Sequence, residues 1–154
     1  MKKILVITTG GTIAMKKDRE TGGLMPAVSG KDMAAAVPGL AHYADLDVLE
    51  FSNKPSGWMT AADMFELSKL IDRLADTDQA DGFVITHGTD TLEETAFFLE
   101  AVLKTEKPVC VTGAMRGASA LSADGPANIL AAVRTAASDD SIGKGVTVCL
   151  GDRI

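Results

Sequence analysis

Five short apolar runs alternate with helical patterns along this chain, and this alternation limits the folds open to it more than any other feature. The runs at residues 3–8, 47–52, 82–86, 108–112 and 145–150 predict strands, and helical patterns begin near residues 31, 60, 91 and 125. Strands that alternate with helices indicate an α/β protein with a doubly wound, mostly parallel sheet and flanking helices. We expect one such domain over residues 1–154.

The stretch from Thr86 to Thr95 begins at the last residue of the third apolar run. Its second half shows helical periodicity, and Thr91 and Glu94 have the spacing of a capping box, which predicts a helix that begins there. Thr89 and Asp90 are then left in the turn at the carboxyl end of a strand, where open α/β sheets bind ligands. The alternative is that Asp90 and Thr91 only cap the helix.

The sequence predicts the first residues of two further helices. Thr60 and Asp63 have capping-box spacing before an apolar stripe that includes Leu67 and Ile71. Asp124 is expected to be the N-cap of the last helix, with Pro126 in its first turn. Between the first two strands, residues 15–30 are polar and without period, and predict a loop that either covers the site or is simply solvated.

Four predicted loops should gather at one edge of the sheet, because the carboxyl ends of parallel strands lie together. Each loop is rich in glycine, in hydroxyl groups or in both, and capping alone does not explain all four. They are Gly10–Thr12, Pro55–Met59, His87–Asp90 and Gly113–Met115.

Composition excludes several classes of function. The net charge of −6 argues against a nucleic-acid-binding surface, and no Lys/Arg run suggests a membrane partner. No apolar run approaches membrane-spanning length, and the first apolar run is too short for a signal peptide. Cys110 and Cys149 each fall in a predicted strand, as expected of buried thiols in a reducing compartment. We expect a cytoplasmic protein.

Threonine hydroxyls are the candidate nucleophiles of these loops. Thr12 and Thr89 need a base to become nucleophilic, and Asp90 is the neighbour of Thr89. His87 is a candidate base, although a histidine near a strand end is more often a structural hydrogen-bonding group. No Gly-x-Ser-x-Gly elbow and no metal-ligand spacing occurs in the sequence.

Backbone N–H groups in the same loops, at Gly11, Gly88 and Ala114, are placed to stabilise an oxyanion. The chemistry that these residue types suggest is acyl transfer through threonine, without a cofactor or a metal.

Two motifs together resemble the bacterial-type L-asparaginase family: Thr9–Ala14, which reads TGGTIA, and His87–Ala96, which reads HGTDTLEETA. Gly113–Arg116 and Ser122–Pro126 fit the family pattern as well, so the similarity runs along nearly the whole chain. The resemblance implies a flavodoxin-like N-terminal asparaginase domain. It also implies hydrolysis of the side-chain amide of asparagine, and often of glutamine, to the acid and ammonia.

The resemblance also implies individual roles. Thr12 matches the nucleophile that forms the acyl-enzyme, and Thr89 matches the second catalytic threonine. Asp90 matches the residue that helps to bind the substrate's α-amino group, and Ser56 the serine that holds its α-carboxylate. Gly88 and Ala114 match backbone contacts to the ligand, and we expect Gly11 and Gly57 to lie against the substrate as well.

The chain departs from the family pattern at three points. The tyrosine of the family's first loop has no counterpart, and Gly57 stands where a glutamine is common. The family's catalytic lysine is expected beyond Ile154, as is a C-terminal domain that completes a neighbour's site in a homo-oligomer. We therefore expect residues 1–154 to be the N-terminal catalytic domain, weak or inactive when isolated.

Three other functions stay open on the sequence. An amino-acid-binding module would use the same pocket without turnover. The amidase subunit of a tRNA-dependent amidotransferase shares these motifs. A flavodoxin-like nucleotide-binding protein is disfavoured, because the Gly-x-Gly-x-x-Gly and P-loop patterns are missing.

Overall fold

A five-stranded parallel sheet forms the centre of the molecule. The computed structural model describes residues 1–10, 36–117 and 120–154, together with the backbone of 15–17 and 24–26. The strand order is β4-β1-β5-β6-β7, and every neighbouring pair is parallel. The strands are β1 (Lys3–Thr8), β4 (Asp45–Glu50), β5 (Gly82–Thr86), β6 (Val109–Thr112) and β7 (Val146–Cys149).

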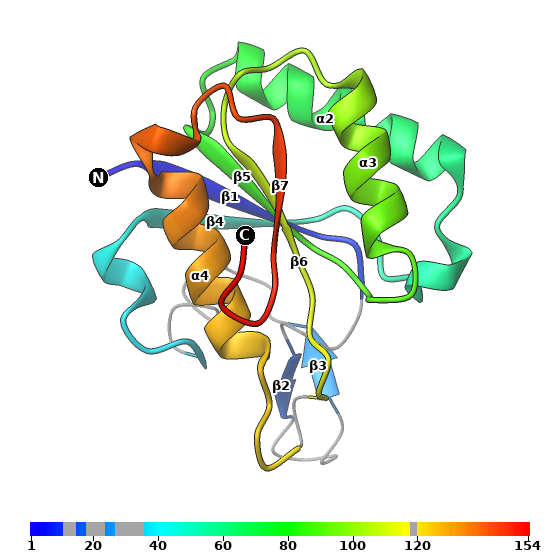
Figure 1. Cartoon of the computed structure of the whole chain (residues 1–154), viewed down its shortest axis with the longest axis vertical. Coiled ribbons are helices and arrows are strands. Elements are labelled where there is room, and N and C mark those ends of the chain that lie inside the picture. Colours follow the sequence, from blue (N-terminus) through cyan, green and yellow to red (C-terminus); the bar gives the residue numbers. More distant parts are fainter. Residues whose placement is uncertain (11–14, 18–23, 27–35, 118–119) are drawn as a thin grey trace.

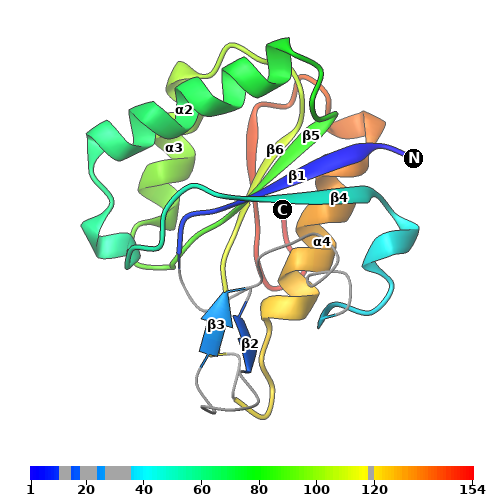
Figure 2. The ribbon, with the colours of Figure 1, turned by 180° about the vertical axis from the view of Figure 1, so that it is seen from behind.

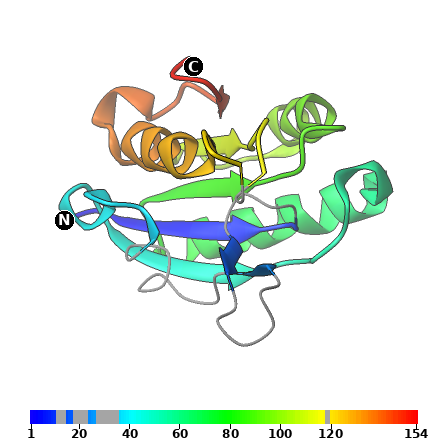
Figure 3. The same ribbon diagram turned by 90° about the horizontal axis from the view of Figure 1, so that it is seen from below.

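Helices cover both faces of the sheet (Figures 1 and 2). Helices α2 (Ala61–Asp76) and α3 (Leu92–Val102) pack on one face, and α4 (Gly125–Ala137) packs on the other. The view along the layers in Figure 3 shows the same separation. The doubly wound α/β class expected from the sequence is confirmed. Strands are added on opposite sides of β1, so the point where the winding reverses, and where ligands bind in such sheets, lies between β1 and β5.

Alternation along the strands divides the core into two clusters. The cluster under α2 and α3 is built from Leu5, Ile7, Phe83, Ile85, Val109 and Val111 of the sheet, with Met64, Leu67, Ile71, Leu92 and Leu99 of the helices. The cluster under α4 contains Ile4, Val6, Val84, Cys110 and Cys149, with Leu40, Ile129, Ala132 and Val133. Both cysteines are free and buried, as the sequence predicted.

The capping box predicted at the start of α2 is present. The Thr60 hydroxyl accepts the Asp63 N–H at 3.2 Å, and the Asp63 carboxylate accepts the Thr60 N–H at 3.0 Å. The Lys54 ammonium lies 2.8 Å from the same carboxylate. This ammonium and the Thr60 bonds lower the pKa of Asp63 to about 2. The loop before α2 is thus tied to the helix that follows it.

A small hairpin lies within the region expected to be only a loop. Strands β2 (Met15–Lys17) and β3 (Leu24–Pro26) pair antiparallel, and the hairpin projects below the carboxyl ends of the strands in Figures 1 and 2. Strands of three residues are too short to show a period in sequence, so the sequence did not predict this hairpin. The helix expected near residue 31 lies mostly outside the described residues, and Leu40–His42 form a short 3-10 turn, η1.

Candidate active site

The loop after β1 is held against the loops after β5 and β4. The Thr9 N–H and hydroxyl both donate to the Thr86 carbonyl, at 3.1 and 3.0 Å. The Lys54 N–H donates to the Thr9 carbonyl at 3.1 Å. Gly10 adopts φ +122°, and a Cβ built on it would lie 2.3 Å from the Lys54 carbonyl oxygen. Only glycine suits this conformation and this close approach.

Ser56 joins the loop after β4 to the start of α3. It begins a 3-10 turn, η2 (Ser56–Trp58), and is 7% exposed. Its hydroxyl accepts the Asp90 N–H at 3.2 Å. A Cβ on Gly88 would lie 2.6 Å from the Ser56 hydroxyl oxygen, and one on Gly57 would lie 3.9 Å from an Asp90 carboxylate oxygen. Four of the predicted site residues therefore come together here: Ser56, Gly57, Gly88 and Asp90.

Thr91 does not do what its spacing predicted. It is the N-cap residue of α3, but its side chain makes no capping bond, so the expected capping box with Glu94 is wrong. Instead the Thr91 hydroxyl donates to the Ser56 carbonyl at 2.8 Å. The hydroxyl is thus oriented toward a carbonyl of another segment and not toward the first N–H groups of its own helix. Thr91 thus fixes the turn that carries Ser56.

His87 lies beneath the Gly88 turn and is 1% exposed. Its Nδ1 lies 2.8 Å from the Gly88 carbonyl oxygen, which can only accept, so Nδ1 carries a proton. Its Nε2 lies 3.0 Å from the Thr95 hydroxyl and accepts from it in the neutral ring. Burial lowers the pKa of His87, against the opposing effect of the Gly88 carbonyl. Both ring nitrogens are engaged, which favours the structural role over that of a base.

We expect His87 to titrate with a midpoint below 6.5, with the proton of its neutral form on Nδ1. A base whose pKa is lower in the folded chain binds fewer protons there, so its contribution to stability is complete above pH 6.5. That contribution is lost as the pH falls through the folded-state pKa. Long-range ¹⁵N–¹H spectra report both the tautomer and the titration. An Nε2–H tautomer, or a midpoint above 6.5, would show that this description of the ring is wrong.

The loop after β6 is held from the side of α4. Asp124 begins that helix, as predicted, but its carboxylate makes no capping bond to it. The carboxylate instead accepts the N–H groups of Met115, at 3.0 Å, and Arg116, at 2.8 Å. Desolvation raises the pKa of Asp124, but these two bonds, together with those from its own N–H and from the Asn128 amide, hold the pKa below its ordinary value. Ala114, half-buried, stands at the start of this loop.

Three threonines form a row across the carboxyl ends of the central strands. Thr8, Thr86 and Thr112 are register partners on β1, β5 and β6. The Thr112 hydroxyl donates to the Cys149 carbonyl at 2.7 Å. The buried Thr86 hydroxyl has no hydrogen-bond partner among the described residues. The sheet therefore presents a polar end beneath the loops, as a site for a polar ligand requires.

The described residues contain most of the predicted site, with two exceptions. Thr12 and Gly11 lie outside them, so the structure places neither the first threonine nor its neighbour. Thr89 is half-buried and Asp90 is exposed at the start of α3, where the helix dipole favours an anionic ligand. Trp58, at the end of η2, is 72% exposed.

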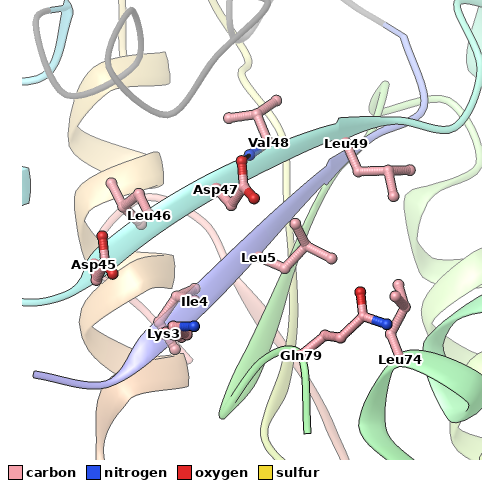
Figure 4. A pocket seen from close by; sticks show the side chains of 10 residues that line it. All are labelled: Lys3, Ile4, Leu5, Asp45, Leu46, Asp47, Val48, Leu49, Leu74 and Gln79. Atoms are coloured by element: carbon pink, nitrogen blue, oxygen red, sulfur yellow. Dashed lines mark hydrogen bonds between the residues drawn. The ribbon is translucent and has the colours of Figure 1, made fainter. Parts of the chain in front are cut away.

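Hollows elsewhere on the described part of the chain are lined by none of the predicted site residues. The described part of the chain holds no group of three His, Cys, Asp or Glu side chains that would bind a metal ion. A hollow of about 330 Å³ lies under the outer strand β4, with Leu5, Leu49 and Leu74 around it (Figure 4). Of its two carboxylates, that of Asp47 accepts the neighbouring Val48 N–H. This hollow contains no hydroxyl group and none of the predicted residues.

Comparison with known proteins decides the family. A family model described as Asparaginase, N-terminal, matches residues 3–154. The chain belongs to the asparaginase family. It is 45% identical to L-asparaginase 2-3 of Saccharomyces cerevisiae and 40% identical to L-asparaginase 2 of Bacillus subtilis, over its full length in both cases. It is also 39% identical to the glutaminase-asparaginase of Pseudomonas aeruginosa.

The asparaginase fold is shared with solved structures too. A crystal structure described as a probable cytoplasmic L-asparaginase from Campylobacter jejuni matches 98% of the chain with a TM-score of 0.85 and 38% identity. The chain covers 45% of that structure, and 42 to 43% of the yeast, Bacillus and Pseudomonas proteins. It therefore spans less than half the length of these relatives. None of its described helices has both the length and the apolar character needed to cross a membrane.

Proposed function

We propose that this chain carries the threonine half of an amidohydrolase site that converts L-asparagine to L-aspartate and ammonia without a cofactor. The observation that carries the proposal is the grouping of Ser56 with Gly88 and Asp90 between the loops after β4 and β5. A hydroxyl and an N-terminal helix turn suit an α-carboxylate, and the exposed Asp90 carboxylate suits an α-ammonium group. Family membership supports the same substrate class, and the Pseudomonas relative's name extends it to glutamine.

In the proposed reaction the Thr12 hydroxyl oxygen attacks the side-chain amide carbon. The carbon–nitrogen bond breaks, the nitrogen leaves as ammonia with the hydroxyl proton, and water hydrolyses the resulting ester. Thr89 is the second catalytic threonine, and the backbone groups of Gly11, Gly88 and Ala114, with Gly57, border the substrate. Support for Thr89 comes from its half-buried position between two residues that contact Ser56 or its turn.

The location and assembly of the enzyme belong to the same proposal. We place it in the cytoplasm as a homo-oligomer, consistent with the cytoplasmic relative from Campylobacter. Large apolar side chains exposed on this chain support association, Phe97 at 76% and Leu121 at 107% among them. Light scattering over a concentration series measures the oligomeric state.

Ammonia release from L-asparagine and from L-glutamine, with Thr12→Ala and Thr89→Ala as controls, tests the proposed function. Release that both variants abolish supports threonine chemistry in this chain. If the chain releases no ammonia but L-aspartate raises its melting temperature, the site binds the product and needs further residues for turnover. Release that survives both substitutions, or the absence of both release and binding, would contradict the proposal.

A further inference from the structure

A buried asparagine on α4 connects three segments around the proposed site. Asn128 lies in the second turn of that helix and is 2% exposed. Its Nδ2 donates to the Gly113 carbonyl at 2.9 Å and to the Asp124 carboxylate at 3.1 Å. Its Oδ1 accepts the Gly151 N–H at 3.0 Å. Two acceptors beside the nitrogen and one donor beside the oxygen fix the orientation of the amide.

Gly113, the first partner of Asn128, lies directly against Thr89. A Cβ built on Gly113 would be 2.9 Å from the His87 carbonyl oxygen and 3.1 Å from the Thr89 Cγ2. A side chain at position 113 would overlap both atoms, so the Gly113 backbone borders the Thr89 side chain directly. The Asn128 amide donates to the Gly113 carbonyl, and so it fixes the backbone that borders Thr89 without being part of the site.

Asp124, the second partner, holds the other side of the same loop. Its carboxylate accepts the N–H groups of Met115 and Arg116. Asn128 bonds both this carboxylate and the Gly113 carbonyl, so Ala114 is fixed on both sides. The Asn128 amide therefore links the two groups that hold this loop, the Gly113 carbonyl and the Asp124 carboxylate.

Gly151, the third partner, belongs to the turn after β7. This turn has positive φ at Gly151 and at Asp152, and it closes with a bridge between Leu150 and Arg153. The Gly151 N–H of this turn donates to the Asn128 Oδ1. Through this amide, the turn after β7 and the loop after β6 share one anchor.

We propose that Asn128 is a positioning residue, whose amide sets the Gly113–Arg116 loop against Thr89 and couples that loop to the turn after β7. This inference rests on the proposed function, since it takes Thr89 and Ala114 as parts of the site. Asn128 itself touches no substrate.

Asn128→Asp is the sharpest test, because it keeps the shape of the side chain and removes both donors. A carboxylate would then face the Gly113 carbonyl and the Asp124 carboxylate. We expect the affinity for L-aspartate at neutral pH to fall at least tenfold by calorimetry, and the Thr89 and Ala114 amide resonances to shift. The defect should diminish as the pH is lowered, because a protonated carboxyl group regains one donor.

Thr135→Val is the matched control. Thr135 lies on the same helix, and its buried hydroxyl donates to the Ala131 carbonyl at 2.9 Å, away from the loops. Its loss should leave the affinity within twofold of the wild type and the Thr89 resonance in place. A folded Asn128→Asp variant with wild-type affinity and an unshifted Thr89 resonance would overturn the proposal.

Two further outcomes can be resolved: a wild-type chain that does not bind L-aspartate, and an Asn128→Asp variant that does not fold. If the wild-type chain does not bind L-aspartate, the proposed function fails for this chain, while the Thr89 and Ala114 resonances of the two variants still decide the role of Asn128. If Asn128→Asp does not fold, the wild-type Nδ2 protons decide it. They should exchange with solvent as slowly as the Gly151 N–H, and fast exchange would overturn the proposal.

Discussion

Gly10→Ala is expected to lower the free energy of unfolding by about 3 kcal/mol or more, from a strained φ and a steric overlap together. Gly10 has φ +122°, and the added methyl carbon would stand 2.3 Å from the Lys54 carbonyl oxygen and 2.7 Å from the Lys54 nitrogen. Both contacts are to backbone, which cannot turn aside as a flexible side chain does. Urea unfolding at neutral pH measures the loss.

Gly143→Ala separates the two causes. Gly143 also has a positive φ, +69°, but a Cβ there would meet nothing within 4 Å. The conformational cost alone should be about 1–2 kcal/mol. If the two variants lose the same stability, the contact between the loops after β1 and β4 does not determine the fold of this edge.

Gly88→Ala is expected to weaken L-aspartate binding at least tenfold. Its methyl carbon would lie 2.6 Å from the Ser56 hydroxyl oxygen and 2.9 Å from the Ser56 Cβ. Ser56 must then move, and its bonds with Asp90 and Thr91 break or lengthen. Calorimetric titration measures the affinity. Gly117→Ala is the control, because a Cβ at Gly117 meets nothing within 4 Å.

A second substitution tests whether the Gly88 effect is steric. Gly88→Ala should also lower the melting temperature, because its methyl group overlaps Ser56. Adding Ser56→Gly removes both overlapped atoms, so the melting temperature should return toward that of the wild type. Binding should not return, because the hydroxyl proposed to hold the α-carboxylate is gone. Wild-type affinity in Gly88→Ala alone would mean that Ser56 and Gly88 do not form the binding site together.

Strands and helices were predictable because each buries a continuous apolar run or an apolar stripe. The apolar run at residues 82–86 is a fully buried central strand, and the stripe containing Leu67 and Ile71 is the face of α2 that packs into the core. The Thr60–Asp63 box was predictable for a similar reason, since both partners lie within one helical turn. Apolar runs and helical stripes are local patterns, so these elements can be located in the sequence. Such patterns did not predict the β2–β3 pairing, because strands of three residues are too short to show a period.

The grouping of the candidate site followed from strand direction, but its supporting contacts did not. Parallel strands end at one edge, so Ser56 and Asp90 could be expected near each other. The hydroxyl of Thr91 and the carboxylate of Asp124 looked like helix caps, because their local spacing favoured capping. Their partners, the Ser56 carbonyl and the Met115 N–H, come from other segments, and such partners appear only when the chain is folded.

Trp58 is a natural fluorescent reporter next to the candidate active site. It is the only tryptophan of the sequence, it stands two residues after Ser56, and it is 72% exposed. Indole emission depends on the polarity around the ring, so a ligand that settles beside η2 should change the colour or intensity of the fluorescence. Unfolding of the core should change the fluorescence less, since the indole ring is already exposed to water. Occupancy of the site and melting of the fold can therefore be followed as separate optical signals in one unlabelled sample.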